Sequence, residues 1–135
     1  MTTPPSAFPD VEALVVDILE ADAALSTAMV RVDAPAGFDG TQSAVLVNRR
    51  GGAWIGDLHV DQPMIELEVY GPDKATAFTL ANAARRALLA AIGNTYGGNT
   101  LSDVVEEDGP RWLPDYLYRG ANRYVGVIKV SLTVF

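Results

Sequence analysis

The chain has 135 residues, 49% hydrophobic and 20% charged, and its 17 acidic and 10 basic side chains give a net charge of −7. This length predicts a single domain, residues 1–135, that buries enough surface for a hydrophobic core. The absence of cysteine excludes disulfides, zinc–thiolate sites and thiol nucleophiles. The acidic balance argues against a free-standing nucleic-acid binder, because phosphate backbones select basic surfaces.

Residues 1–8 are expected to be a flexible lead, because Pro4 and Pro5 block regular structure. This stretch has neither the basic region nor the apolar run of a secretion signal, so the simplest compartment is a cytoplasm. The apolar runs elsewhere are too short to span a membrane. We therefore expect a globular domain with no membrane partner.

Two stretches have the periodicity of amphipathic helices. In residues 9–23 the apolar stripe consists of Val11, Leu14, Val15 and Ile18. In residues 73–92 it consists of Ala77, Ala81, Ala84, Leu88, Ala91 and Ile92. Because alanine dominates the second stripe, this helix is expected to approach a sheet closely.

Strands are predicted at residues 29–33, 44–48, 64–70, 101–105, 111–118 and 124–135. In the third of them Ile65, Leu67 and Val69 alternate with polar positions, so one sheet face is dry and the other is charged. An acidic turn, residues 106–110, is expected to separate the fourth strand from the fifth. The order α-β-β-β-α-β-β-β predicts an α+β fold, a mostly antiparallel sheet with two helices packed on one face.

The segment from Gly51 to Pro63 is rich in glycine and polar residues, yet it contains Trp54, Ile55 and Leu58. Large apolar side chains on such a segment either fold back onto the core or wait for a partner. We expect a poorly ordered segment that becomes ordered when it meets a partner.

Candidates for chemistry are few. His59 lies between Asp57 and Asp61 at alternate positions, which suggests at most a weak metal site, and a solvated histidine is the simpler interpretation. Glu66 and Glu68 lie about 7 Å apart on one strand face, a spacing that resembles a glycosidase acid pair. Such pairs normally come from different elements around a cleft. We therefore predict no catalytic, cofactor-binding or metal site, and a non-enzymatic protein.

Aromatic and arginine residues concentrate in loops and irregular segments, and these residue types are enriched at protein–protein interfaces. The alternative is that some of them fill a small core. The residues predicted to form an interface are Arg49, Arg50, Trp54, Ile55, Leu58, Tyr96, Trp112 and Tyr116.

The order of elements and several loose motifs resemble a known family over residues 8–135. The motifs are F-P-D-V-E-A-L-V-V-D-I-L, V-R-V-D, N-R-R-G-G, V-D-Q-P-M-I-E-L-E-V-Y-G-P-D-K-A-T-A-F-T-L-A and R-Y-V-G-V-I-K-V-S-L-T-V-F. This pattern resembles the tail-terminator proteins of long-tailed bacteriophages, also called tail-completion or head–tail joining proteins.

The resemblance implies a virion protein at the head-proximal end of the tail, made in the host cytoplasm. It implies a homohexameric ring that caps the tail tube, stops its polymerisation and meets a head-completion or connector protein. It implies no catalytic residues and no cofactor. DNA would pass through the ring without specific binding, along an electronegative lumen. The acids predicted to line that lumen are Glu66, Glu68, Glu106, Glu107 and Asp108.

Three alternatives remain open at this point. The first is a neighbouring connector or tail-tube protein, for which residues 51–63 would supply the long hairpin that stacks one ring on the next. The second is a small acid/base hydrolase using Glu66 and Glu68. The third is a nucleic-acid-mimicking inhibitor, suggested by the acidic first helix.

Overall fold

The computed structural model describes residues 9–56, 59–114, 118 and 120–134. Over these residues the chain forms helix α1 (Val11–Glu20), the 3₁₀ helix η1 (Ala23–Leu25), helix α2 (Lys74–Ala90) and a six-stranded sheet. The strands are β1 (Met29–Arg31), β2 (Ala44–Ile55), β3 (Val60–Gly71), β4 (Thr95–Tyr96), β5 (Asn99–Trp112) and β6 (Asn122–Val134). The predicted α+β fold is confirmed. The lead predicted at residues 1–8 lies outside the described residues.

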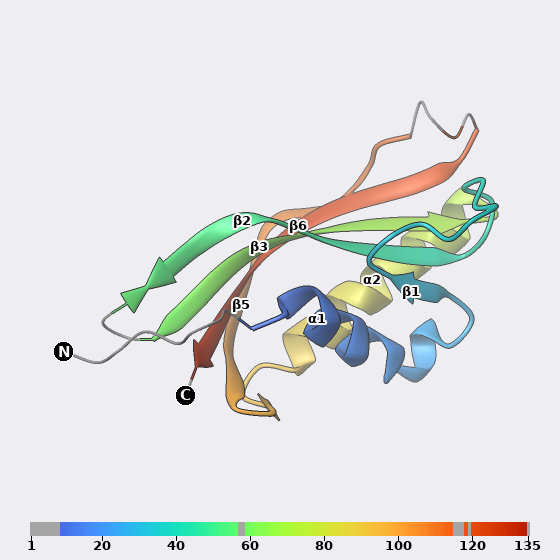
Figure 1. Cartoon of the computed structure of the whole chain (residues 1–135). Coiled ribbons are helices and arrows are strands. Elements are labelled where there is room, and N and C mark those ends of the chain that lie inside the picture. Colours follow the sequence, from blue (N-terminus) through green and yellow to red (C-terminus); the bar gives the residue numbers. More distant parts are fainter. Residues whose placement is uncertain (1–8, 57–58, 115–117, 119, 135) are drawn as a thin grey trace.

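The strands lie in the order β1-β2-β3-β6-β5-β4. Only β1 and β2 run parallel within the described sheet, and the other neighbours are antiparallel. Both helices cover the same face (Figure 1). Helix α1 packs on β1 and β2, whereas α2 packs mainly on β3, β6 and β5. None of the described helices is long and apolar enough to cross a membrane.

Helix α1 buries the predicted stripe and begins where the sequence indicates. The Asp10 carboxylate caps the helix by accepting the Ala13 N–H at 3.1 Å. The buried residues are Val11, Leu14, Val15, Ile18 and Leu19. They form one core with α2 and with the helix-facing side chains of the sheet, among them Ile65, Leu67 and Val69.

Helix α2 lies close to the sheet, as its alanine stripe predicts. A Cβ on Gly71, the last residue of β3, would lie only 2.7 Å from the Ala77 nitrogen. No side chain fits between the strand and the helix there. The stripe is buried through Ala91, but Ile92 is 41% exposed, because the helix ends at Ala90 and the chain turns away at Gly93 with φ of +93°.

The segment from Gly51 to Pro63 corrects an expectation, since most of it is ordered β-structure. β2 continues to Ile55 and β3 begins at Val60, so the two strands form a long hairpin that extends past α1 (Figure 1). Gly51 and Gly52 lie at a β-bulge, where the register with β3 shifts between Arg49 and Gly52. Gly52 has φ of +119°, and a Cβ there would overlap the Gln62 carbonyl oxygen. We call residues 51–63 the arm.

The acidic turn predicted at residues 106–110 is also wrong. These residues belong to β5, which runs unbroken from Asn99 to Trp112 and absorbs the extra residues as three irregularities in its register with β6. The strand predicted at 101–105 and the first two residues of the strand predicted at 111–118 therefore belong to one strand. Residues 113, 114 and 118 are not in a strand, and residues 115–117 lie outside the described part. The sheet nevertheless has six strands, as predicted, because the structure contains one additional short strand, β4 (Thr95–Tyr96).

The face away from the helices has a small core of its own, which the sequence pattern did not reveal. Phe38, from the connector between β1 and β2, lies over Ala44, Leu46 and Tyr70. Its ring packs edge-to-face on Tyr70 at 5.0 Å. One end of this sheet face is thus covered, and the remaining part carries charged side chains.

Candidate functional site

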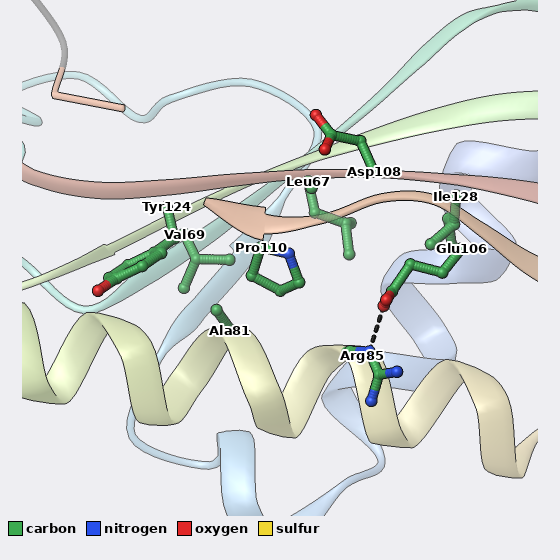
Figure 2. A pocket seen from close by; sticks show the side chains of 10 residues that line it. Leu67, Val69, Ala81, Arg85, Glu106, Asp108, Pro110, Tyr124 and Ile128 are labelled. Carbon is green, nitrogen blue, oxygen red and sulfur yellow. Dashed lines mark hydrogen bonds and ion pairs between the residues drawn. The ribbon is translucent and has the colours of Figure 1, made fainter. Parts of the chain in front are cut away.

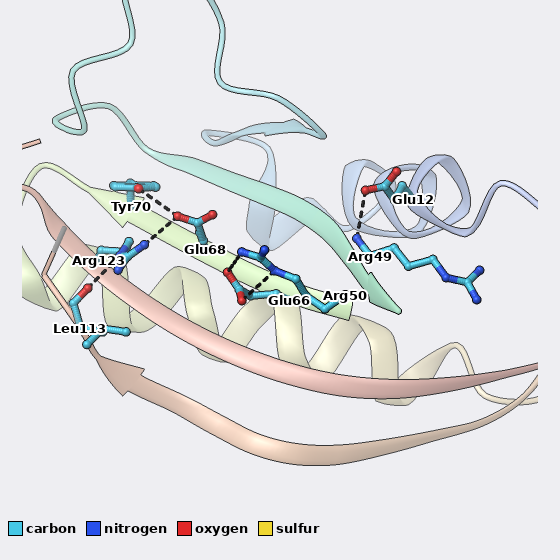
Figure 3. A network of polar contacts seen from close by, with 8 residues as sticks. All are labelled: Glu12, Arg49, Arg50, Glu66, Glu68, Tyr70, Leu113 and Arg123. Atoms are coloured by element: carbon cyan, nitrogen blue, oxygen red, sulfur yellow. Dashed lines mark hydrogen bonds and ion pairs between the residues drawn. The ribbon is translucent and has the colours of Figure 1, made fainter. Parts of the chain in front are cut away.

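The charged part of the uncovered sheet face is a row of ion pairs (Figure 3). Arg50 on β2 engages Glu66 on β3 with two hydrogen bonds, Nε to Oε2 at 3.0 Å and Nη2 to Oε1 at 2.8 Å. The hydrogen bonds with Glu66, and then the attraction of its charge, raise the pKa of Arg50 above its ordinary value. Because successive strand residues point to opposite faces, Arg50 and Arg49 lie on different sides of the sheet.

Glu68 lies further along β3 at the centre of a second group. Its Oε2 accepts from Arg123 Nη1 at 2.8 Å and from the Tyr70 hydroxyl at 3.2 Å. Arg123 Nε donates to the Leu113 carbonyl oxygen at 2.8 Å, so the same guanidinium links β6 to the residue after β5 (Figure 3). Both charged side chains are 16% exposed, which makes this pair better shielded than Arg50–Glu66.

This geometry favours a structural role for the two carboxylates. Glu66 and Glu68 lie side by side on an open sheet face, and each has an arginine partner. A glycosidase pair would instead face one another across a substrate cleft. The weak metal site considered at His59 gains no support from the structure. The described residues contain no group of three His, Asp or Glu side chains that could hold a metal ion. Asp57, which the sequence analysis considered together with His59 and Asp61, lies outside the described residues.

All five acids predicted to line a lumen have a basic partner. Besides Glu66 and Glu68, Glu106 pairs with Arg85, Asp108 with Arg111 at 3.0 Å, and Glu107 with Lys129 at 3.6 Å. They do not share one surface. Glu106 points to Arg85 on α2 whereas Asp108 points away from that helix (Figure 2). The five acids therefore do not form a continuous, unneutralised acidic wall on this chain.

The base of the arm is built around Arg49. Its guanidinium makes two hydrogen bonds to Asp61, each of 3.0 Å, and its Nε donates to the Gly51 carbonyl oxygen at 3.1 Å. Its backbone N–H donates to Glu12 of α1 at 3.0 Å. Arg49 thus joins both strands of the hairpin to α1, which makes it a structural residue rather than a free interface contact.

The end of the arm carries Trp54 and Ile55 from the predicted interface. Trp54 is half-buried, lies opposite Asp61 in the ladder, and contacts the His59 ring with the centroids 6.0 Å apart. Ile55 is 36% exposed. Leu58, the third apolar residue predicted there, lies outside the described residues.

The other predicted interface residues lie elsewhere. Tyr96 in β4 is half-buried and packs against the main core. Trp112 lies at the end of β5 that is opposite to the arm, because β5 pairs there with Tyr124 of β6. Tyr116 lies outside the described residues. Those of the eight residues that the structure describes therefore do not form one patch.

A second surface, missed by the sequence analysis, lies where α2 meets β5 (Figure 2). A narrow groove with a cavity volume of about 20 Å³ lies between them, lined chiefly by apolar atoms. Its lining includes Ala81, Arg85, Glu106, Pro110, Tyr124 and Ile128. Near the Tyr124 end of the groove, Phe78 is 47% exposed and Trp112 36% exposed. The sequence does contain a sign of this surface. Phe78 is a large aromatic residue outside the alanine stripe of the helix, a position that is expected to face outward.

A comparison of the fold with solved structures finds a chain that matches nearly the whole length of this one. The TM-score is 0.67 at 19% sequence identity, and the match covers 90% of this chain and 93% of the other. The matched chain belongs to a structure described as "Virion of native gene transfer agent (GTA) particle". The two chains share a fold. No protein-family model and no curated protein matches the sequence.

Proposed function

We propose that this chain is a structural virion protein that terminates a tail: it forms a ring, caps the tail tube and joins it to the head. The observation that carries the proposal is the shared fold, over 90% of this chain and 93% of the other, with a chain of a virion particle. A match that spans both chains involves the whole architecture rather than one common motif. At 19% identity the likeness concerns the fold, so the role in the particle comes from the resemblance of the sequence motifs.

The arrangement of polar residues supports an assembly role. The carboxylates of Glu66 and Glu68 on the open sheet face are held in ion pairs, and exposed large apolar side chains lie on the arm, on α2 and on β5. Aromatic and arginine residues at such positions are typical of protein–protein contacts. The proposed partners are further copies of this chain in a hexamer, the tail-tube protein and the head-completion protein, with DNA passing through the ring unbound.

The decisive experiment is capping of tail tubes. Tail-tube protein from the same genome is polymerised with and without this protein, and tube lengths and ends are measured by electron microscopy. We expect shorter tubes that carry a ring at one end. Tubes of unchanged length without end rings would contradict the proposal.

The long hairpin favours one second candidate, a neighbouring connector or tail-tube protein. The β2–β3 hairpin continues past the helices (Figure 1), and stacking of rings requires such an arm. The same experiment separates the two functions, because a tube protein would polymerise into tubes by itself. A terminator would form at most single rings without the tube protein.

A further inference from the structure

The apolar groove between α2 and β5 continues into an exposed aromatic surface. The Tyr124 ring, at the floor of the groove, contacts Phe78 and Trp112, each with ring centroids 5.4 Å apart. Lys74 Nζ lies 4.6 Å from the centroid of the Trp112 ring. Leu113, next to Trp112, is 39% exposed. Half of the six large apolar residues that are exposed in the described part therefore lie within this one surface, which we call the aromatic patch.

Basic side chains lie on α2 and at the end of β5, and one of them, Lys74, lies over the Trp112 ring of the aromatic patch. Lys74, Arg85 and Arg86 project from α2, and Arg111 lies at the end of β5. Glu106 and Asp108 neutralise two of these bases, Arg85 and Arg111. Lys74 and Arg86 form no ion pair with any described residue. Asp73 caps α2 beside Lys74.

Helix α1 has the opposite character. Asp10, Glu12, Asp17, Glu20 and Asp22 lie on it or next to it, with no base in the same stretch. None of these acids forms an ion pair with a described residue. Since α1 packs over β1 and β2 while α2 packs over β3, β6 and β5, the acidic helix and the aromatic patch flank opposite sides of the helical layer.

We propose that the aromatic patch is the docking surface for a second copy of this chain, and that α1 of that copy is the element that occupies it. The apolar side chains of the patch would supply the buried centre of the contact. The acids of α1 would pair with Lys74 and Arg86 at its rim. A contact between two different surfaces of one chain is head-to-tail, and it closes into a ring when the rotation between copies permits. The proposal rests on the proposed ring function and assigns the surfaces that build the ring.

The first experiment compares two matched substitutions in the full-length protein. Phe78→Ser removes an exposed aromatic from the patch, whereas Ile92→Ser removes an exposed side chain of similar character at the other end of α2. Self-association is measured by analytical ultracentrifugation over a concentration series. We expect Phe78→Ser to weaken association about tenfold or more, and Ile92→Ser to leave it unchanged. Equal effects of the two changes, or no effect of either, would overturn the proposal.

The second experiment tests the pairing of the two surfaces by charge reversal. One variant carries Lys74→Glu and Arg86→Glu, and the other carries Asp17→Lys and Glu20→Lys. Each variant alone should fail to assemble, because it brings like charges together at every contact. An equimolar mixture should assemble again, because each contact in an alternating ring is then complementary. Assembly of either variant alone, or failure of the mixture to assemble, refutes the pairing of patch and α1.

Cross-linking covers the case in which free copies associate weakly. The chain has no cysteine, so Phe78→Cys and Ala13→Cys place single thiols on the patch and on α1. A short bismaleimide should join a mixture of the two variants more efficiently than either variant alone. Equal or absent cross-linking in the mixture argues against the contact. Tubes capped normally by the charge-reversed Lys74/Arg86 variant would refute this interface alone, whereas wild-type protein that caps no tubes would refute the proposed function.

Discussion

Arg49 and Asp61 are joined by two hydrogen bonds of 3.0 Å at the base of the β2–β3 arm, and the Asp61 carboxylate is almost completely buried. One residue further along the chain, Arg50 makes an equally short pair with Glu66 on the opposite face, where the arginine is 56% exposed. The two pairs have the same chemistry and differ in solvent exposure. A buried carboxylate that loses its basic partner is left as an uncompensated charge away from water, which destabilises the fold. In an exposed pair, water solvates each charge even when the partner is removed, so the pair contributes little to stability.

Arg49→Met should therefore lower the free energy of unfolding by about 3 kcal/mol, because it leaves the Asp61 charge buried without its partner. Arg50→Met should cost less than about 1 kcal/mol. Urea denaturation of both variants checks the difference. The double variant Arg49→Met/Asp61→Leu should regain much of the lost stability, and equal losses in the two single variants would contradict this account.

Leu67→Ala should lower the free energy of unfolding by about 2–5 kcal/mol, since Leu67 is 5% exposed and lies between β3 and α2. Val105→Ala is the control on a sheet position that is 40% exposed, and it should change stability by no more than about 0.5 kcal/mol. Thermal and urea unfolding give both numbers. A negligible loss in Leu67→Ala would contradict the face assignment.

Gly52→Ala should destabilise the protein more than Gly51→Ala. Both glycines have positive φ, at +119° and +91°, so each substitution carries backbone strain of about 1–2 kcal/mol. Only at Gly52 would the new Cβ also overlap the Gln62 carbonyl oxygen, whereas a Cβ at Gly51 meets nothing within 4 Å. Equal losses in urea unfolding would show that the bulge relaxes around the added methyl group.

Ile55→Asp tests the arm as a contact surface. Ile55 is 36% exposed, so the change should alter the free energy of unfolding by about 0.5 kcal/mol or less. It should nevertheless reduce capping of tail tubes, because a charge at a buried contact has to be desolvated. Tube lengths in the capping experiment provide the measurement. Full capping by this variant would exclude the end of the arm from the interface with the tube.

Asp73 should contribute a measurable pH dependence. Its carboxylate accepts the Thr76 N–H at 2.7 Å at the start of α2, and this hydrogen bond lowers the pKa of Asp73 below its ordinary value. A depressed pKa in the folded state means that the stabilisation is present above the usual aspartate pKa of about 3.9 and is lost as the pH falls through the lower, folded-state value. Asp73→Asn should show a shallower fall in melting temperature between pH 5 and pH 2. An unchanged slope would contradict this contribution.

Local patterns in the sequence determined the elements that bury one face against the core. The stripe of α1, the alanine stripe of α2 and the alternation of Ile65, Leu67 and Val69 predicted both helices, the strand between them and the face that the helices cover. These features could be predicted because burial imposes a period of 3.6 or 2 on consecutive residues.

Only the tertiary structure decided the arm, the continuity of β5 and the partner of each charged residue. Glycines and acids are typical of turns in a single sequence, but a strand can absorb them as bulges when its neighbour holds the ladder, as β3 does for Gly52 and β6 for Glu106–Pro110. Ion pairs such as Arg123–Glu68 join residues far apart in the chain, so composition could supply the net charge but not its distribution. The aromatic patch has the same origin, because α2, β5 and β6 bring Phe78, Trp112 and Tyr124 together only after folding.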